Sequence, residues 1–199
     1  PQLTPKAVEE FWKIPGVAAV IPITRLQGGE VNAGKLSGYV DTIGIDARLL
    51  PYLRLSVEKG VLSLERGQVL IGQNAGDYFY DPKATGDAYQ TIPVDLFDTP
   101  FKLKLYSYDG SGNQRQIKVT AAGKMAANDR FNFSMLMPIQ DVFSYNEWVT
   151  GTKIDPKTFV YDQVVIRSST RETTNQVSEA IREMGYQAGG MGEIGRAHV

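Results

Sequence analysis

One strictly alternating segment most limits what the middle of this chain can fold into. Residues 101–105 read Phe-Lys-Leu-Lys-Leu, which places three apolar side chains on one face of a strand and both lysines on the other. The sequence Asp-Gly-Ser-Gly at 109–112 predicts a tight turn, and Ile117, Val119 and Ala121 resume the alternation on a return strand. We therefore expect an antiparallel hairpin with one apolar face, which must pack against a core.

The N-terminal segment predicts a helix followed by a strand. Thr4 can cap a helix that starts at Pro5, and Phe11 lies on its apolar face. Residues 17–25 are rich in β-forming residues, but Pro22 cannot donate a hydrogen bond to a neighbouring strand. We predict that this segment is an edge strand or that it breaks at the proline.

The C-terminal part also combines helix and strand signals. Helical spacing is predicted over 139–148, a short strand over 162–168, and a second helix up to Gly185. Ser169 and Glu172 have the spacing of a capping box for that last helix. Between 60 and 138 the pattern contains β signals and turns without a long helix.

This arrangement predicts an α+β fold with two lobes. Residues 1–57 and 160–190 are expected to form a split α/β lobe of βαβ type, and residues 58–159 an inserted small β-rich lobe. Residues 191–199 are glycine-rich at their start and are expected to form a flexible tail outside the domain, of the kind that cloning can leave behind.

Composition excludes several classes of function. The 199 residues carry 21 Lys and Arg against 22 Asp and Glu, and this balance argues against binding a nucleic-acid backbone. The absence of cysteine rules out thiol catalysis and thiolate metal sites. The single histidine, His198, lies in the expected tail and is predicted to be inert. No apolar run approaches the roughly 20 residues of a membrane span.

Six segments, in this order, carry a resemblance to a known family: 14–22 (IPGVAAVIP), 42–46 (TIGID), 66–72 (RGQVLIG), 101–123, 133–141 and 164–184. They resemble the extracytoplasmic core domain of MacB-type ABC transporter permeases, within the FtsX-like family that also includes LolC-type proteins. The resemblance extends over residues 4–186.

The resemblance implies a domain between the first two membrane spans of a permease, outside the cell membrane, with a split lobe and a small inserted lobe. It implies a cytoplasmic ABC ATPase, a permease homodimer or heterodimer, and a periplasmic adaptor, lipoprotein or peptide as further partner or cargo. It also implies that the domain is not an enzyme and holds no catalytic residue, cofactor or metal. Residues 4 and 186 should then lie close together, at the membrane-facing side.

The acidic residues of the middle loops are the candidates for a carboxylate-based catalytic site. These residues are Asp77, Asp81, Asp87, Asp95 and Asp98. Two such carboxylates held close together could hydrolyse a glycosidic bond, so a carboxylate-based hydrolase stays open. The loops lack the spacing of a calcium-binding loop, and solvated loop acids are the simpler interpretation.

Two other features of the middle region could be functional. The glycines of 72–77 follow a strand but lack the pattern of a phosphate-binding loop, so they predict a turn. The aromatic residues there can either pack the small lobe or form a contact patch, and they are Tyr78, Phe79, Tyr80, Tyr89 and Phe97. A free-standing domain for a small ligand or peptide is the remaining alternative, and it predicts a deep, enclosed pocket.

Overall fold

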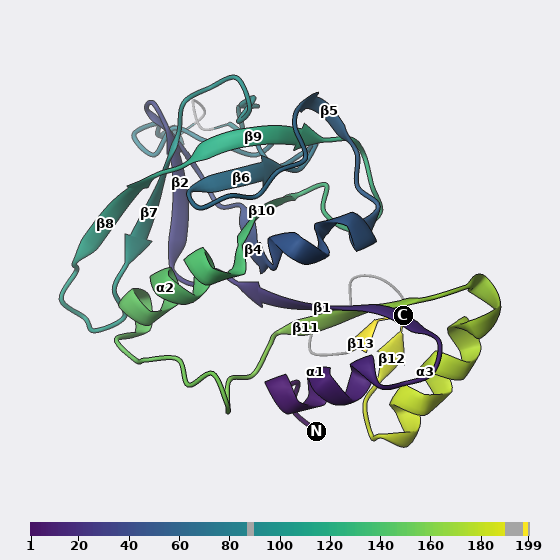
Figure 1. The fold of residues 1–199 in the computed structure, drawn as a ribbon. Coiled ribbons are helices and arrows are strands. Elements are labelled where there is room, and N and C mark those ends of the chain that lie inside the picture. The colour runs from purple at the N-terminus through teal and green to yellow at the C-terminus, as the bar shows by residue number, and fades with distance from the viewer. Residues whose placement is uncertain (87–89, 190–196, 199) are drawn as a thin grey trace. The chain divides into compact units, whose positions relative to one another are not determined.

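The computed structural model describes residues 1–86, 90–189 and 197–198, and the expected α+β class is confirmed (Figure 1). The chain divides into two compact units, each built from more than one segment. The first unit contains residues 1–24, 48–54 and 153–199, and the second contains residues 25–47 and 55–152.

The first unit combines a small sheet with helices. Its strands lie in the order β12-β13-β11-β1, with β1 and β11 antiparallel. Its elements are α1 (Pro5–Trp12), β1 (Val17–Arg25), η1 (Ala47–Leu53), β11 (Gln163–Ser168), η3 (Arg171–Thr173), α3 (Thr174–Glu183), β12 (Ala188–Gly189) and β13 (Ala197–His198). Strand β1 continues through Pro22, which lies opposite Val164 of β11. The predicted break at the proline is therefore wrong.

In the core of this unit, the apolar faces of α1 and α3 pack with residues of β1 and β11. The buried residues are Leu3, Ala7, Phe11, Val20, Val164, Ile166, Val177 and Ile181. Thr4 caps α1 as predicted, because its side chain accepts a hydrogen bond of 3.2 Å from the amide of Ala7. The capping box before α3 was predicted one residue early. It joins Thr170 and Thr173, because a short 3-10 turn precedes the helix and makes Thr173 the residue whose amide needs an acceptor.

The second unit contains two sheets and one helix. Strands β4-β10-β6-β9-β5 lie side by side in one sheet, and the other has the order β3-β2-β7-β8. The elements are β2 (Gly29–Ala33), β3 (Leu36–Gly38), β4 (Asp41–Ile45), β5 (Val57–Gly60), β6 (Gln68–Ile71), β7 (Lys102–Tyr106), β8 (Gln114–Lys118), β9 (Thr120–Met125), β10 (Ser134–Pro138) and α2 (Ile139–Thr150).

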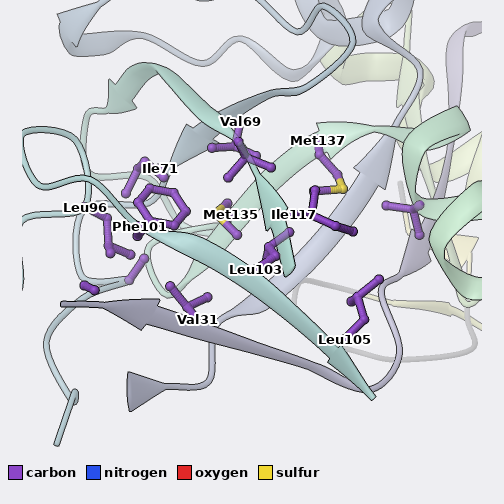
Figure 2. Packing of buried hydrophobic residues seen from close by; sticks show 14 of the residues in the cluster. Val31, Val69, Ile71, Leu96, Phe101, Leu103, Leu105, Ile117, Met135 and Met137 are labelled. Carbon is purple, nitrogen blue, oxygen red and sulfur yellow. The ribbon is translucent and has the colours of Figure 1, made fainter. Parts of the chain in front are cut away.

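The hairpin predicted from the alternating segment is β7 and β8, and its apolar face is buried as expected. Figure 2 shows Leu103, Leu105 and Ile117 of this hairpin in one cluster with Val69 of β6 and Met135 of β10. Ala121 does not belong to the return strand. The chain leaves the small sheet after β8, and β9 pairs in parallel with β6 instead. One alternating run therefore supplies strands to both sheets.

Residues 25–47 belong to the second unit, whereas the sequence grouped them with the first. The physical reason is β2, a strand that the sequence analysis did not predict. It pairs antiparallel with β7 across Gly29–Asn32 and carries Val31 into the same core. The division into a split lobe of residues 1–57 and 160–190 and an inserted lobe of residues 58–159 stays a prediction.

The predicted tail of residues 191–199 lies mostly outside the described residues. Ala197 and His198 are described by their backbone, and they form β13, which pairs in parallel with β11. The flexible tail expected over residues 191–199 therefore stays a prediction.

Candidate functional site

Segments from the two ends of the first unit meet at one place. The hydroxyl of Tyr186 donates a hydrogen bond of 3.1 Å to the carbonyl of Gln2, and its ring lies edge-on to Phe11 with 5.0 Å between ring centroids. Burial, with the charge of Glu10 nearby, raises the pKa of Tyr186 and keeps this hydroxyl a donor. Tyr186 thus contacts Gln2, two residues before Thr4, which agrees with the expected proximity of residues 4 and 186, and their membrane-facing position stays a prediction.

A second feature lies on the small sheet of the second unit. A groove of about 440 Å³ is lined by residues from β2, β7, β8 and the segment before β7: Asn32, Gly34, Pro100, Phe101, Lys102, Gln116, Lys118 and Val119. We call this surface the cationic groove. It is open to solvent, unlike the enclosed pocket that a free-standing ligand-binding domain predicts.

The cationic groove is positively charged because the strand register places two lysines side by side. Asn32, Lys102 and Lys118 lie opposite one another on three neighbouring strands. The alternation of β7 sends Lys102 outward while Leu103 enters the core. Like charges directly opposite in a sheet are destabilising, so this pair lowers the stability of the hairpin. Charges also protect an edge strand such as β8 from pairing with other chains, and that is the structural alternative to a binding role.

A hydrogen-bonded network of polar groups continues from the cationic groove along β2. The carboxylate of Glu30 accepts hydrogen bonds from the hydroxyl of Tyr106 (2.6 Å) and from the side-chain amide of Asn32 (2.8 Å). Partial burial raises the pKa of Glu30, but these two bonds, with Ser37 and the charge of Lys104, outweigh it and leave the pKa below its ordinary value. The same bond to Glu30 raises the pKa of Tyr106 to about 12.

The candidate acids are held in turns rather than gathered in an active site. Asp81 accepts from the amide of Lys83, and Asp77 accepts from the side chain of Asn74. Asp95 accepts from the amides of Phe97 and Asp98. Asp87 lies outside the described residues.

Asp95 and Asp98 come together around one cation, because Nζ of Lys59 lies 2.8 Å from Asp98 and 3.6 Å from Asp95. Slight burial raises the pKa of Asp95, but the amides of Asp98 and Phe97 and two nearby lysines lower it overall. A glycosidase acid needs a raised pKa. Within the described residues, no three acidic or histidine side chains are placed to hold a metal ion.

The aromatic residues divide between the two predicted roles. Phe79 is 1% exposed and packs in the core, whereas Tyr78 is 67% exposed and stacks on Phe133, with 6.3 Å between ring centroids. Phe97 and Tyr80 are half-buried, and Tyr89 lies outside the described residues. The aromatic patch on the surface is thus Tyr78 with Phe133, a partner that sequence reasoning did not assign.

The glycines after β6 are required by close packing of backbone. A Cβ atom on Gly72 would collide with the carbonyl of Phe131, and one on Gly76 with the carbonyl of Val94. Among the described residues, 72–77 form a turn, as predicted, and these contacts account for its glycines without a phosphate ligand.

Sequence reasoning also missed Asn146, a buried amide in α2. Its Oδ1 accepts from the amide of Gln27 at 2.8 Å, and its Nδ2 donates to the carbonyl of Arg25 at 2.9 Å. The only available signal was an asparagine within a helical pattern whose neighbours Val142 and Val149 are apolar. Nothing in the sequence indicates which backbone it would bind.

Comparison with known proteins identifies the fold. No family model and no curated protein matches the chain. Among solved structures, the extracellular domain of the noncanonic ABC-type transporter YknZ from Gram-positive bacteria is similar, at 11% identity and a TM-score of 0.51, over 92% of this chain and 83% of that one. The periplasmic region of MacB from Actinobacillus actinomycetemcomitans is also similar, at 14% identity and a TM-score of 0.50, over 92% and 75%. The chain has the fold of an extracytoplasmic ABC-permease domain.

The resemblance expected from the six sequence segments is thereby confirmed for the fold. Since identities of 11% and 14% carry no residue-by-residue correspondence, no functional residue is transferred from these proteins. Within the described residues, the helices are too short or too polar to cross a bilayer.

Proposed function

We propose that this chain is the extracytoplasmic domain of a MacB/FtsX-type ABC permease. In this role it couples ATP hydrolysis in the cytoplasm to export, lipoprotein handling or the action of a partner protein outside the membrane. The observation that carries the proposal is the fold shared with domains of YknZ and MacB. The contact of Tyr186 with Gln2 supports it, because a domain inserted between two membrane spans needs its entry and exit close together.

The proposed role involves no bond-making chemistry by this domain. The alternatives lack support of equal weight: the cationic groove is open to solvent, and the clustered acids Asp95 and Asp98 are both paired with Lys59. The partners that belong to this proposal are an ABC ATPase subunit, a second permease subunit and a periplasmic adaptor, lipoprotein or peptide.

Cysteine labelling in intact cells tests the location. The chain contains no cysteine, so Tyr78→Cys in the parent protein introduces one exposed thiol into this domain. A membrane-impermeant maleimide should label it in intact cells if the domain lies outside the cell membrane. The matched control is Ala75→Cys, since Ala75 is buried three residues away and should react only after denaturation. Labelling of Tyr78→Cys only after lysis would contradict the proposal.

The cationic groove is the surface we propose for an acidic segment of a partner or cargo. Its two lysines face solvent on neighbouring strands, a geometry suited to an extended chain with carboxylates. The double variant Lys102→Glu/Lys118→Glu should reduce the transport phenotype of the parent while the protein level stays unchanged. Lys35→Glu reverses one exposed lysine that does not line the cationic groove, and as the control for charge reversal at the surface it should have little effect.

A further inference from the structure

A second hollow, in the first unit, combines positive charge with hydroxyl groups. It has a volume of about 250 Å³ and lies between the end of η1 and the segment that joins β11 to α3. Its lining contains three arginines, Arg54, Arg167 and Arg171, and four serine or threonine residues between 168 and 174. We call it the arginine pocket. None of the described residues that line it is acidic, although the chain as a whole carries one more acidic than basic residue.

The three arginines of the arginine pocket are not paired with a carboxylate of the described residues. Within the part of the chain that the structure describes, no ion pair involves Arg54, Arg167 or Arg171. Guanidinium groups stay charged at every physiological pH, so this hollow concentrates positive charge under all conditions in which the protein works. An anion that enters it would be attracted by all three.

Local structure holds parts of this lining in place. Nε of Arg167 donates a hydrogen bond of 3.2 Å to the carbonyl of Tyr52 in η1, which fixes the guanidinium and leaves its two terminal nitrogens for another acceptor. The hydroxyls of Ser168 and Thr174 lie 2.7 Å apart, so one of them donates to the other. The pocket therefore presents a fixed guanidinium fork beside hydroxyl groups.

The backbone conformation of Arg54 is a second, independent observation at the arginine pocket. Arg54 has φ of +53°, and it is the one non-glycine residue with positive φ in the described part of the chain. Such a conformation is unfavourable for a side chain with a Cβ atom, and strained residues of this kind gather at binding sites. Glycine would relieve the strain, but here the position carries an arginine that lines the pocket.

We propose that the arginine pocket binds a phosphate group. Guanidinium forks match the paired oxygens of phosphate, and hydroxyls can donate to its remaining oxygens. Three positive charges also favour a group that can carry two negative charges over a single carboxylate. The phosphate could belong to a lipid headgroup or to a soluble molecule. This proposal does not depend on the permease assignment, since it rests on the lining of one pocket.

Titration of the full chain with inorganic phosphate, followed by NMR, tests the chemistry. We expect the amide signals of residues 168–174 to shift, and the affinity to fall by about tenfold or more in Arg54→Gln/Arg171→Gln. Both side chains are exposed, so the variant should fold, which its spectrum and melting temperature check. Arg182→Gln is the matched control on α3, because Arg182 pairs with Glu179 outside the pocket. It should bind phosphate as the wild type does.

Vesicle binding distinguishes the two sources of phosphate. If a lipid headgroup is the ligand, the chain should sediment with vesicles that contain phosphatidic acid, a phosphate monoester that can carry two charges, but not with phosphatidylcholine vesicles, and the double variant should lose this binding. Binding of inorganic phosphate without sedimentation would support a soluble phosphate compound. The proposal is overturned if phosphate leaves residues 168–174 unshifted, or if Arg54→Gln/Arg171→Gln binds it as tightly as the wild type. Should that double variant fail to fold, Arg171→Gln alone decides by the same criterion.

Discussion

The buried amide of Asn146 supports a quantitative prediction about stability. Asn146 is 5% exposed, and its side chain bridges two backbone groups, the carbonyl of Arg25 at the end of β1 and the amide of Gln27 just after it. Asn146→Ala removes both hydrogen bonds. Each contributes about 0.5–1.5 kcal/mol net, and a buried group left without a partner costs about 1–3 kcal/mol.

The expected loss is moderate because one of the two freed groups can find water. The freed amide belongs to Gln27, an exposed residue, whereas the freed carbonyl belongs to Arg25, which is half-buried. We therefore expect the free energy of unfolding to fall by about 1–3 kcal/mol. For a chain of this length, that corresponds to a decrease of roughly 3–10 °C in melting temperature.

Two measurements check this prediction. Urea denaturation should give the loss of stability, and hydrogen exchange should show faster exchange of the Gln27 amide, the group that loses its acceptor. Asn113→Ala is the control, because Asn113 is an exposed loop residue of the same type and should leave both quantities unchanged. If Asn146→Ala melts with the wild type and the Gln27 amide remains protected, the reasoning about this bridge is refuted.

Three further changes have definite expected outcomes. Gly76→Ala should strongly reduce the yield of folded protein, since its Cβ atom would meet the carbonyl of Val94; a variant as stable as the wild type in thermal melts would refute this contact. Tyr106→Phe should raise the pKa of Glu30 in a carboxyl NMR titration, because a hydrogen bond that lowers it is lost. The folded-state pKa of Glu30 lies below its ordinary value of 4.5, so its stabilising effect is present above that pH and disappears as the pH falls through the folded-state pKa. Tyr106→Phe should weaken this acid dependence. Lys118→Glu should stabilise the protein in urea by about 0.2–1 kcal/mol, because it places opposite charges on Lys102 and position 118.

The sequence predicted the elements whose signals are local. The alternation in β7, the cap at Thr4 and the helix end near Gly185 each depend on residues within a few positions of one another, and the structure contains all three. The strand β2 was missed because its five residues begin with glycine and include two polar side chains, so only its pairing with β7 makes it a strand.

The candidate surfaces were harder to predict because they join distant segments. The cationic groove depends on the register between β7 and β8, which sets Lys102 opposite Lys118. The arginine pocket joins Arg54 to Arg167 across more than a hundred residues, and no local pattern marks either one as a binding residue. The sequence left open which of Tyr78 and Phe79 is buried, and both this difference and the stacking of Tyr78 on Phe133 depend on the tertiary fold.

The tie between Gln2 and Tyr186 has a mechanical consequence. Forces that pull Gln2 and Tyr186 in the same direction would move the first unit as a whole, without stretching its core. Loads in opposite directions would instead peel the ring of Tyr186 from Phe11, an edge contact that can separate before the strands β1 and β11 slide past each other. The junction would therefore yield first under such tension, leaving the interior strand pairing intact.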